Sequence, residues 1–133
     1  QVNVDGAHPV MAGMPETAFI PTGAGAHGLY PSRDGTRLYV TNRKAGSVTV
    51  LDFATRAPVA TWTIAGGGSP DMGGVSADGT QFWVSGRYND VVYVFDTTTG
   101  ALTHTIPVDH GPHGLAIFPQ PGKISLGHTG NYR

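Results

Sequence analysis

The feature that most limits how this chain can fold is an internal repeat of 44 residues. It emerges when the turn pair Asp34-Gly35 is placed on Asp78-Gly79. The run LYVTN at 38–42 then falls on FWVSG, and GSVTVLD at 46–52 falls on DVVYVFD. A third, partial copy begins at 112 with PHGLAIFP, which is similar to AHGLYPSR in the first unit. Similarity at one fixed period is typical of folds built from repeated supersecondary units.

Apolar residues alternate with period two inside each unit, which indicates strands with one buried face. The Asp-Gly pairs supply the positive φ angles that tight hairpin turns need, and no segment has a helical pattern. The predicted strands are 26–30, 37–42, 47–52 and 58–64 in the first unit, and 72–76, 81–86, 91–96 and 101–108 in the second. Four strands in a period of about 40 to 45 residues are typical of a β-propeller blade. We therefore expect an all-β fold, a β-propeller made of four-stranded antiparallel blades.

The predicted strands divide the chain into about three blade equivalents. Residues 26–68 and 69–111 each form a blade, 1–25 supply the C and D strands of an incomplete blade, and 112–133 supply the A and B strands of another. A closed ring normally needs about four to eight blades. Either a homo-oligomer closes the ring by joining the half blades of two chains, or the missing blades belong to a longer chain.

The LYVTN run resembles the namesake motif of the YVTN-type β-propeller repeat family, and the similarity extends over 26–133. The family's PHG and SxDG elements stand at 112–114 and 32–35. The second unit departs from the pattern, with PDMGG at 70–74 and WVSG at 83–86. The resemblance implies an extracytoplasmic propeller (periplasmic, secreted or at the cell surface). Similar propellers also include lactonases, lyases and quinoprotein dehydrogenases, but no residues here identify a redox cofactor site.

Composition excludes several classes of function. The net charge is -1 and the two signs are interspersed, so we expect no nucleic-acid binding. Cysteine is absent, which excludes disulfides, thiolate nucleophiles and cysteine-bound zinc. No apolar run is long enough to span a membrane. The first residues lack the basic and apolar regions of a signal peptide, so an export signal would lie outside this chain.

The expected up-and-down strand order sorts the loops onto two rims of the propeller. The connections between blades, and those from the second to the third strand of each blade, share one rim and carry most of the reactive side chains. The opposite rim receives mainly turn residues such as Asp34 and Asp78. The candidate ligand-binding residues on the first rim are His27, Arg43, Asp71, Arg87, Tyr88, His113 and His128.

Three of these candidates, His27, Asp71 and His113, occupy equivalent positions where the innermost strand enters the central channel. Imidazole and carboxylate groups arranged around one axis could bind a divalent metal ion, and no other cofactor is indicated. The alternative is that repeat equivalence alone aligns them, and that each side chain bonds to the neighbouring blade or to channel water.

Arg43 and Arg87 also recur at one repeat position, with Tyr88 beside the second. Together they could recognise an anionic or planar ligand. The alternative role is a salt bridge to an aspartate of a neighbouring blade. The candidate partners are Asp71, Asp90 and Asp109.

These observations lead to two hypotheses of different classes. The first is a non-catalytic scaffold that binds a protein or a small-molecule ligand through the rim. The second is a metal-assisted lactonase or lyase, with a metal ion over the channel acting as a Lewis acid. The second predicts one bound divalent ion, which replacement of His113 by alanine would remove.

Overall fold

The structure is a computed structural model that describes residues 20–120. Predictions for 1–19 and 121–133 lie outside the described residues. They include the half blade at the start of the chain, His128, and most of the half blade at the end. Within the described part, all regular structure is β-strand.

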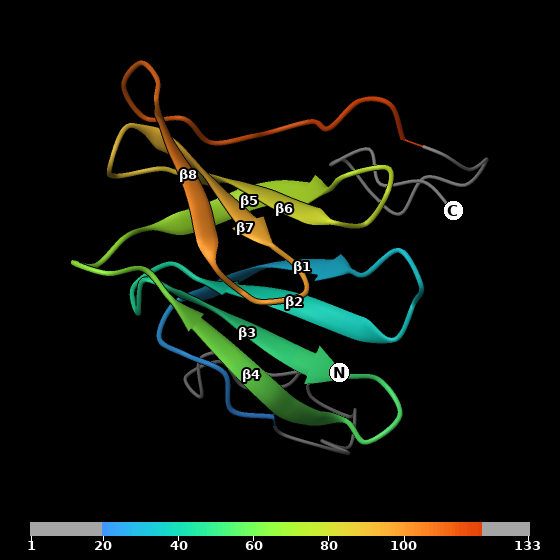
Figure 1. Ribbon diagram of the computed structural model, residues 1–133. Helices are drawn as coiled ribbons and strands as arrows, with labels where there is room; N and C mark the ends of the chain where they lie inside the picture. Colours follow the sequence, from blue (N-terminus) through green and yellow to red (C-terminus); the bar gives the residue numbers. More distant parts are fainter. Residues whose placement is uncertain (1–19, 121–133) are drawn as a thin grey trace, which may run out of the picture.

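Eight strands form two four-stranded antiparallel sheets, which lie one above the other in Figure 1. Each sheet follows chain order, β1-β2-β3-β4 and β5-β6-β7-β8, as expected for propeller blades. The first sheet consists of β1 (Ala26–Pro31), β2 (Arg37–Asn42), β3 (Ser47–Asp52) and β4 (Ala57–Thr63). The second consists of β5 (Pro70–Val75), β6 (Gln81–Gly86), β7 (Val91–Asp96) and β8 (Leu102–Pro107). The predicted all-β architecture is therefore confirmed.

The two repeat units form equivalent turns. Gly35 and Gly79 have φ angles of 70° and 79°, the left-handed conformation that glycine adopts without strain. Asp34 accepts hydrogen bonds from the Thr36 amide at 3.0 Å and the Thr36 hydroxyl at 2.9 Å. Asp78 accepts the same two bonds from Thr80 at the same distances. The Asp-Gly pairs therefore occupy like places in the two sheets.

An aromatic core joins the two blades. Tyr39 of the first sheet stacks on Phe82 of the second, with ring centroids 5.2 Å apart. Trp62 stacks on Phe95 at 5.8 Å, and Tyr30 also contacts Phe82, at 5.4 Å. All five rings are buried. Such rings contribute both apolar burial and specific pair geometry, and they fix one blade against the next.

Two buried hydroxyl groups connect successive inner strands. The Thr41 hydroxyl accepts from the Gly28 amide at 2.8 Å and donates to the Asp71 carbonyl at 2.8 Å. Ser85 occupies the equivalent place and donates to the His113 carbonyl at 2.7 Å. The segment after β8 therefore meets the second blade as β5 meets the first.

Residues 112–120 form no strand in the described part of the chain, although an A strand was predicted to begin there. Its predicted partner strand falls in 121–133, outside the described residues, so the blade boundaries at the two ends remain predictions. Nowhere in residues 20–120 does the chain form a helix long and apolar enough to cross a membrane.

Candidate functional site

A β-bulge opens each inner strand and places one candidate residue. The pairing of β1 with β2 shifts between Ala26 and Leu29, and that of β5 with β6 shifts between Pro70 and Gly73. His27 lies within the first bulge and Asp71 within the second. Bulges re-aim side chains and are common next to functional sites. Both side chains therefore leave the regular pleat at the channel end of their blades.

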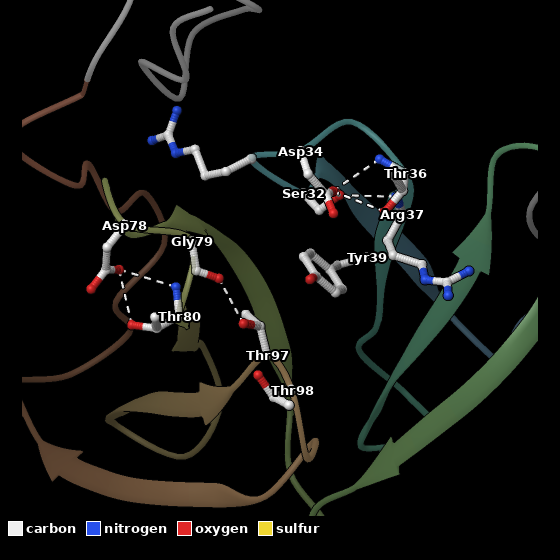
Figure 2. Close-up of a pocket in the computed structure, with 11 residues that line it drawn as sticks. Ser32, Asp34, Thr36, Arg37, Tyr39, Asp78, Gly79, Thr80, Thr97 and Thr98 are labelled. Carbon is white, nitrogen blue, oxygen red and sulfur yellow. Dashed lines mark hydrogen bonds between the residues drawn. The ribbon is translucent and has the colours of Figure 1, made fainter.

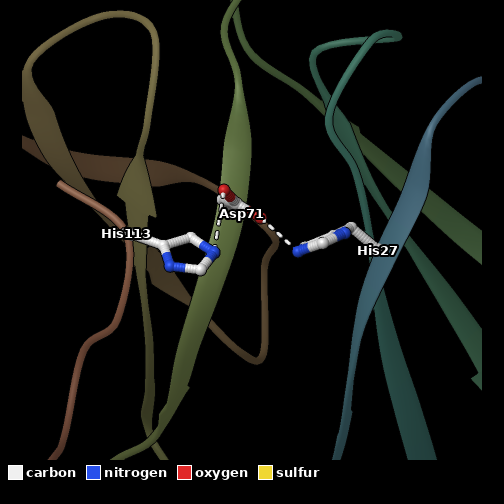
Figure 3. A group of neighbouring side chains, drawn as sticks. All are labelled: His27, Asp71 and His113. Atoms are coloured by element: carbon white, nitrogen blue, oxygen red, sulfur yellow. Dashed lines mark ion pairs between the residues drawn. The ribbon is translucent and has the colours of Figure 1, made fainter. Parts of the chain in front are cut away.

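Asp71 stands at the centre of the site, and Figure 3 shows it between His27 and His113. Its side chain is fully buried, with 0% exposure. Nε2 of His27 lies 2.8 Å from Oδ1 of Asp71, and Nε2 of His113 lies 4.0 Å from Oδ2. One ligand atom from each of the three residues lies within 4.8 Å of the others. The structure thus brings the three predicted metal candidates together.

Both arginines reach the same carboxylate. Nη1 of Arg43 lies 3.5 Å from Oδ2 of Asp71, and Nη1 of Arg87 lies 3.7 Å from it. Of the candidate partners, the structure selects Asp71. Asp90 instead pairs with His110, at 3.1 Å. A buried carboxylate is costly unless opposite charge compensates it, and the two guanidinium groups supply that compensation.

Tyr88 lies beside both arginines and is 67% exposed. The guanidinium carbons of Arg43 and Arg87 lie 5.6 Å and 5.7 Å from the centre of its ring, within the range of cation–π attraction. One aromatic ring therefore holds two cations that come from equivalent repeat positions. We refer to His27, Arg43, Asp71, Arg87, Tyr88 and His113 as the rim cluster.

The rim cluster has hydrogen-bonding capacity to spare. Neither side-chain oxygen of Asp71 has a partner in hydrogen-bond geometry. Among the described residues, no hydrogen bond is formed by the guanidinium group of Arg43 or Arg87, and their side chains are 22% and 37% exposed. A guanidinium carries five N–H donors. The cluster is therefore joined by charge, and it leaves donors directed at solvent.

The charge balance bears on which ligand the cluster can hold. Two guanidinium groups against one carboxylate leave one positive charge when the imidazoles are neutral. Two unit charges about 4 Å apart interact by about 4 kcal/mol at the effective dielectric of a protein surface. A divalent ion at that separation would be opposed by about 8 kcal/mol from each arginine. The spacing of His27, Asp71 and His113 suits a metal ion, whereas the surrounding charge favours an anion.

The opposite rim has a different character. A cleft of about 440 Å³ lies there between the blades, and Figure 2 shows its lining. Hydrogen bonds from the Ser32 hydroxyl, and then from the amide and hydroxyl of Thr36, lower the pKa of Asp34 to about 2. The pKa of Asp78 is also lowered, first by the Ser76 hydroxyl and then by Thr80. These carboxylates are bound within their own turns, in agreement with the turn role predicted for them.

Sequence reasoning missed the Thr41 and Ser85 hydroxyls, although both stand at one repeat position. Their recurrence is a usable signal, because a buried hydroxyl at an equivalent position in every blade indicates a shared structural bond. The structure also gives no place to His128, which lies outside the described residues.

Comparison with protein families decides the assignment. The model of the YNCE-like beta-propeller family matches residues 4–121. The chain belongs to that family. No curated protein matches it.

Solved structures that resemble this family member are also propellers or contain them. Kuenenia stuttgartiensis hydrazine synthase is 25% identical, with a TM-score of 0.64 over 77% of this chain and 29% of that chain. The Cps50 (Swd1) beta-propeller domain of Myceliophteria thermophila is 15% identical, with a TM-score of 0.59 over 69% of this chain and 28% of that chain. Apo AztD from Citrobacter koseri is 14% identical, with a TM-score of 0.56 over 80% of this chain and 39% of that chain. The last two show the fold alone, and the chain spans well under half of each structure it matches.

Proposed function

We propose that this chain forms part of a non-catalytic, ligand-binding β-propeller of the YVTN-repeat type, and that the rim cluster is its ligand site. One observation carries the proposal. A single buried carboxylate, Asp71, gathers four nitrogen-bearing side chains from three successive repeats, and these side chains keep exposed N–H groups. Perturbed and convergent charged groups of this kind favour a binding role.

The hydroxyl groups nearest the cluster support a non-catalytic role. Thr41 and Ser85 are 0% and 1% exposed, and each is bonded to the backbone of two inner strands. A serine or threonine nucleophile needs access to substrate and a base to activate it. These two hydroxyls serve as links between blades instead.

We further propose that additional blades complete the ring and that the protein works outside the cytoplasm. The described part supplies two blades, and the chain spans 28–39% of the propeller structures it matches. The extra blades would come from a second copy of this chain or from a longer polypeptide. A solution mass of twice the chain mass of 13.9 kDa would support the dimer, and a stable monomer would exclude it.

A panel of ligand classes tests the binding function. Thermal unfolding would be followed with phosphate and succinate, with magnesium, manganese, calcium and zinc ions, with neutral sugars, and with a lactone. We expect at least one class to raise Tm in the wild type and in Lys44→Gln, but not in Arg87→Gln or in His113→Ala. Lysine 44 is the control because it carries the same charge on an exposed neighbouring position. If no class changes Tm, the proposal is wrong.

A metal-assisted lactonase or lyase is the second candidate, and the spacing of His27, Asp71 and His113 favours it. These three residues would hold the ion, which would supply Lewis acidity. This candidate requires one divalent ion per chain, lost in His113→Ala, and lactone turnover that a chelator abolishes. Metal analysis with and without chelator, combined with a lactone assay, separates it from the binding function.

A further inference from the structure

We propose that the rim cluster is an oxyanion site, which binds the carboxylate or phosphate group of a small ligand between Arg43 and Arg87. This inference rests on the proposed function, in that it names the ligand class for the same site. It also separates the roles of the cluster residues. The arginines and imidazoles contact the ligand, and Asp71 is a positioning residue beneath them.

The donors are the first element of the argument. In each arginine, Nη1 faces Asp71, at 3.5 Å for Arg43 and 3.7 Å for Arg87. The guanidinium group is a rigid planar fork, so its remaining N–H groups point away from the atom that faces the carboxylate. No described residue accepts a hydrogen bond from them. Two forks with free donors at one place match the geometry of a planar carboxylate or a phosphate.

Pre-organisation is the second element. Arginine side chains lose considerable rotamer freedom when they bind a ligand. Here Asp71 on one side and the Tyr88 ring, 5.6 Å and 5.7 Å away, already restrain both guanidinium groups. Ordering paid in the free protein does not weaken binding later. Because Tyr88 is itself 67% exposed, it also offers an open ring face beside the oxyanion.

The position of Asp71 is the third element. Its carboxylate is fully buried, so it neutralises part of the arginine charge without contacting a ligand at the surface. The side chains of His27 and His113 are 35% and 51% exposed. Their imidazole N–H groups can add donors at the edge of the site. The net positive charge selects a mono- or dianion over a divalent cation.

Titration calorimetry at low salt, with sodium phosphate and sodium succinate as probes, tests the inference. We expect saturable binding of at least one probe, which identifies whether phosphate or carboxylate is preferred. Arg43→Gln and Arg87→Gln should each weaken binding by about tenfold or more, the effect of one lost charge-assisted hydrogen bond. Lys44→Gln should change it by less than about twofold, and added sodium chloride should weaken it.

A second variant distinguishes an oxyanion from a metal ion. Asp71→Asn removes a negative charge below the site, so oxyanion binding should be unchanged or tighter, whereas binding of a divalent ion at this carboxylate would be lost. Arg43→Lys answers the same question if Asp71→Asn does not fold, because it keeps the charge and removes the fork. That variant should weaken oxyanion binding and leave divalent-ion binding unchanged.

The outcomes separate the inference from the function beneath it. If neither probe binds, or if Lys44→Gln weakens binding as much as the arginine variants do, the oxyanion site is wrong. The ligand-binding function still stands if a sugar or a metal ion binds in a way that rim-cluster variants abolish. If nothing binds, both are wrong.

Discussion

The two rims of the described blades treat aspartate in opposite ways. On the turn rim, Asp34 and Asp78 bond to residues only two positions away in sequence. On the other rim, Asp71 has partners 16 to 44 positions away, which come from different repeats. Local bonds complete a turn and leave little capacity for a ligand. Partners from several repeats converge only because the blades stack, and here they leave donors over.

The two rims also differ in how far their threonines are buried. Thr41→Val should break the link from the Thr41 hydroxyl to Gly28 and Asp71. Because both backbone groups are buried and would lose a partner, we expect the free energy of unfolding to fall by about 3 kcal/mol. Urea denaturation with optical detection measures this loss.

The matched control is Thr36→Val, the same change at an exposed position of the turn rim. It should alter the free energy of unfolding by no more than about 0.5 kcal/mol. Equal losses in the two variants would remove the distinction between the rims.

Acid sensitivity sharpens the comparison on the turn rim. The folded state lowers the pKa of Asp34 from 3.8 to about 2, so the bonds to its carboxylate stabilise the protein above pH 3.8 and are lost as the pH falls through 2. Asp34→Asn should cost no more than about 1 kcal/mol at neutral pH, because the site is exposed. Unfolding curves of wild type and variant between pH 5 and pH 2 should converge toward the acid end. A constant difference across that range would contradict this assignment.

The smallest expected effect concerns the arginines of the rim cluster. Arg43→Gln or Arg87→Gln alone should lower the free energy of unfolding by about 0.5 kcal/mol, because the second guanidinium still compensates Asp71. The double variant should lose more than the sum, since it leaves a buried carboxylate without a cation. A double-mutant cycle from urea denaturation measures the coupling. Strict additivity would show that the two arginines act independently.

Most of the fold could be predicted from the sequence, because strand alternation and turn chemistry depend on close neighbours. Seven of the eight predicted strands begin within one residue of those observed, whereas the strand predicted at 72–76 begins at Pro70. The difference lies at the bulge between Pro70 and Gly73, where the pairing register shifts. A Cβ atom on Gly73 would lie 1.8 Å from the Trp83 carbonyl oxygen. Close backbone contact of this kind is not visible as periodicity.

The candidate site was predicted less completely. The repeat placed His27, Asp71 and His113 at equivalent positions, and the strand order placed both arginines on their rim. The sequence left three aspartates as candidate partners for the arginines. Loop conformation decided among them, because Asp90 adopts a φ of 56° and accepts bonds from His110 and Gly111 instead.

By itself, the sequence determined that the chain is a tandem array of small antiparallel sheets, and which side chains reach each rim. These properties follow from alternation, turns and repeat length, all of which act over short stretches of chain. Only the tertiary structure decided that two arginines and two histidines share one buried aspartate. The reason is that packing between blades, through Tyr30 and Phe82 for example, sets the distances between residues about one repeat apart.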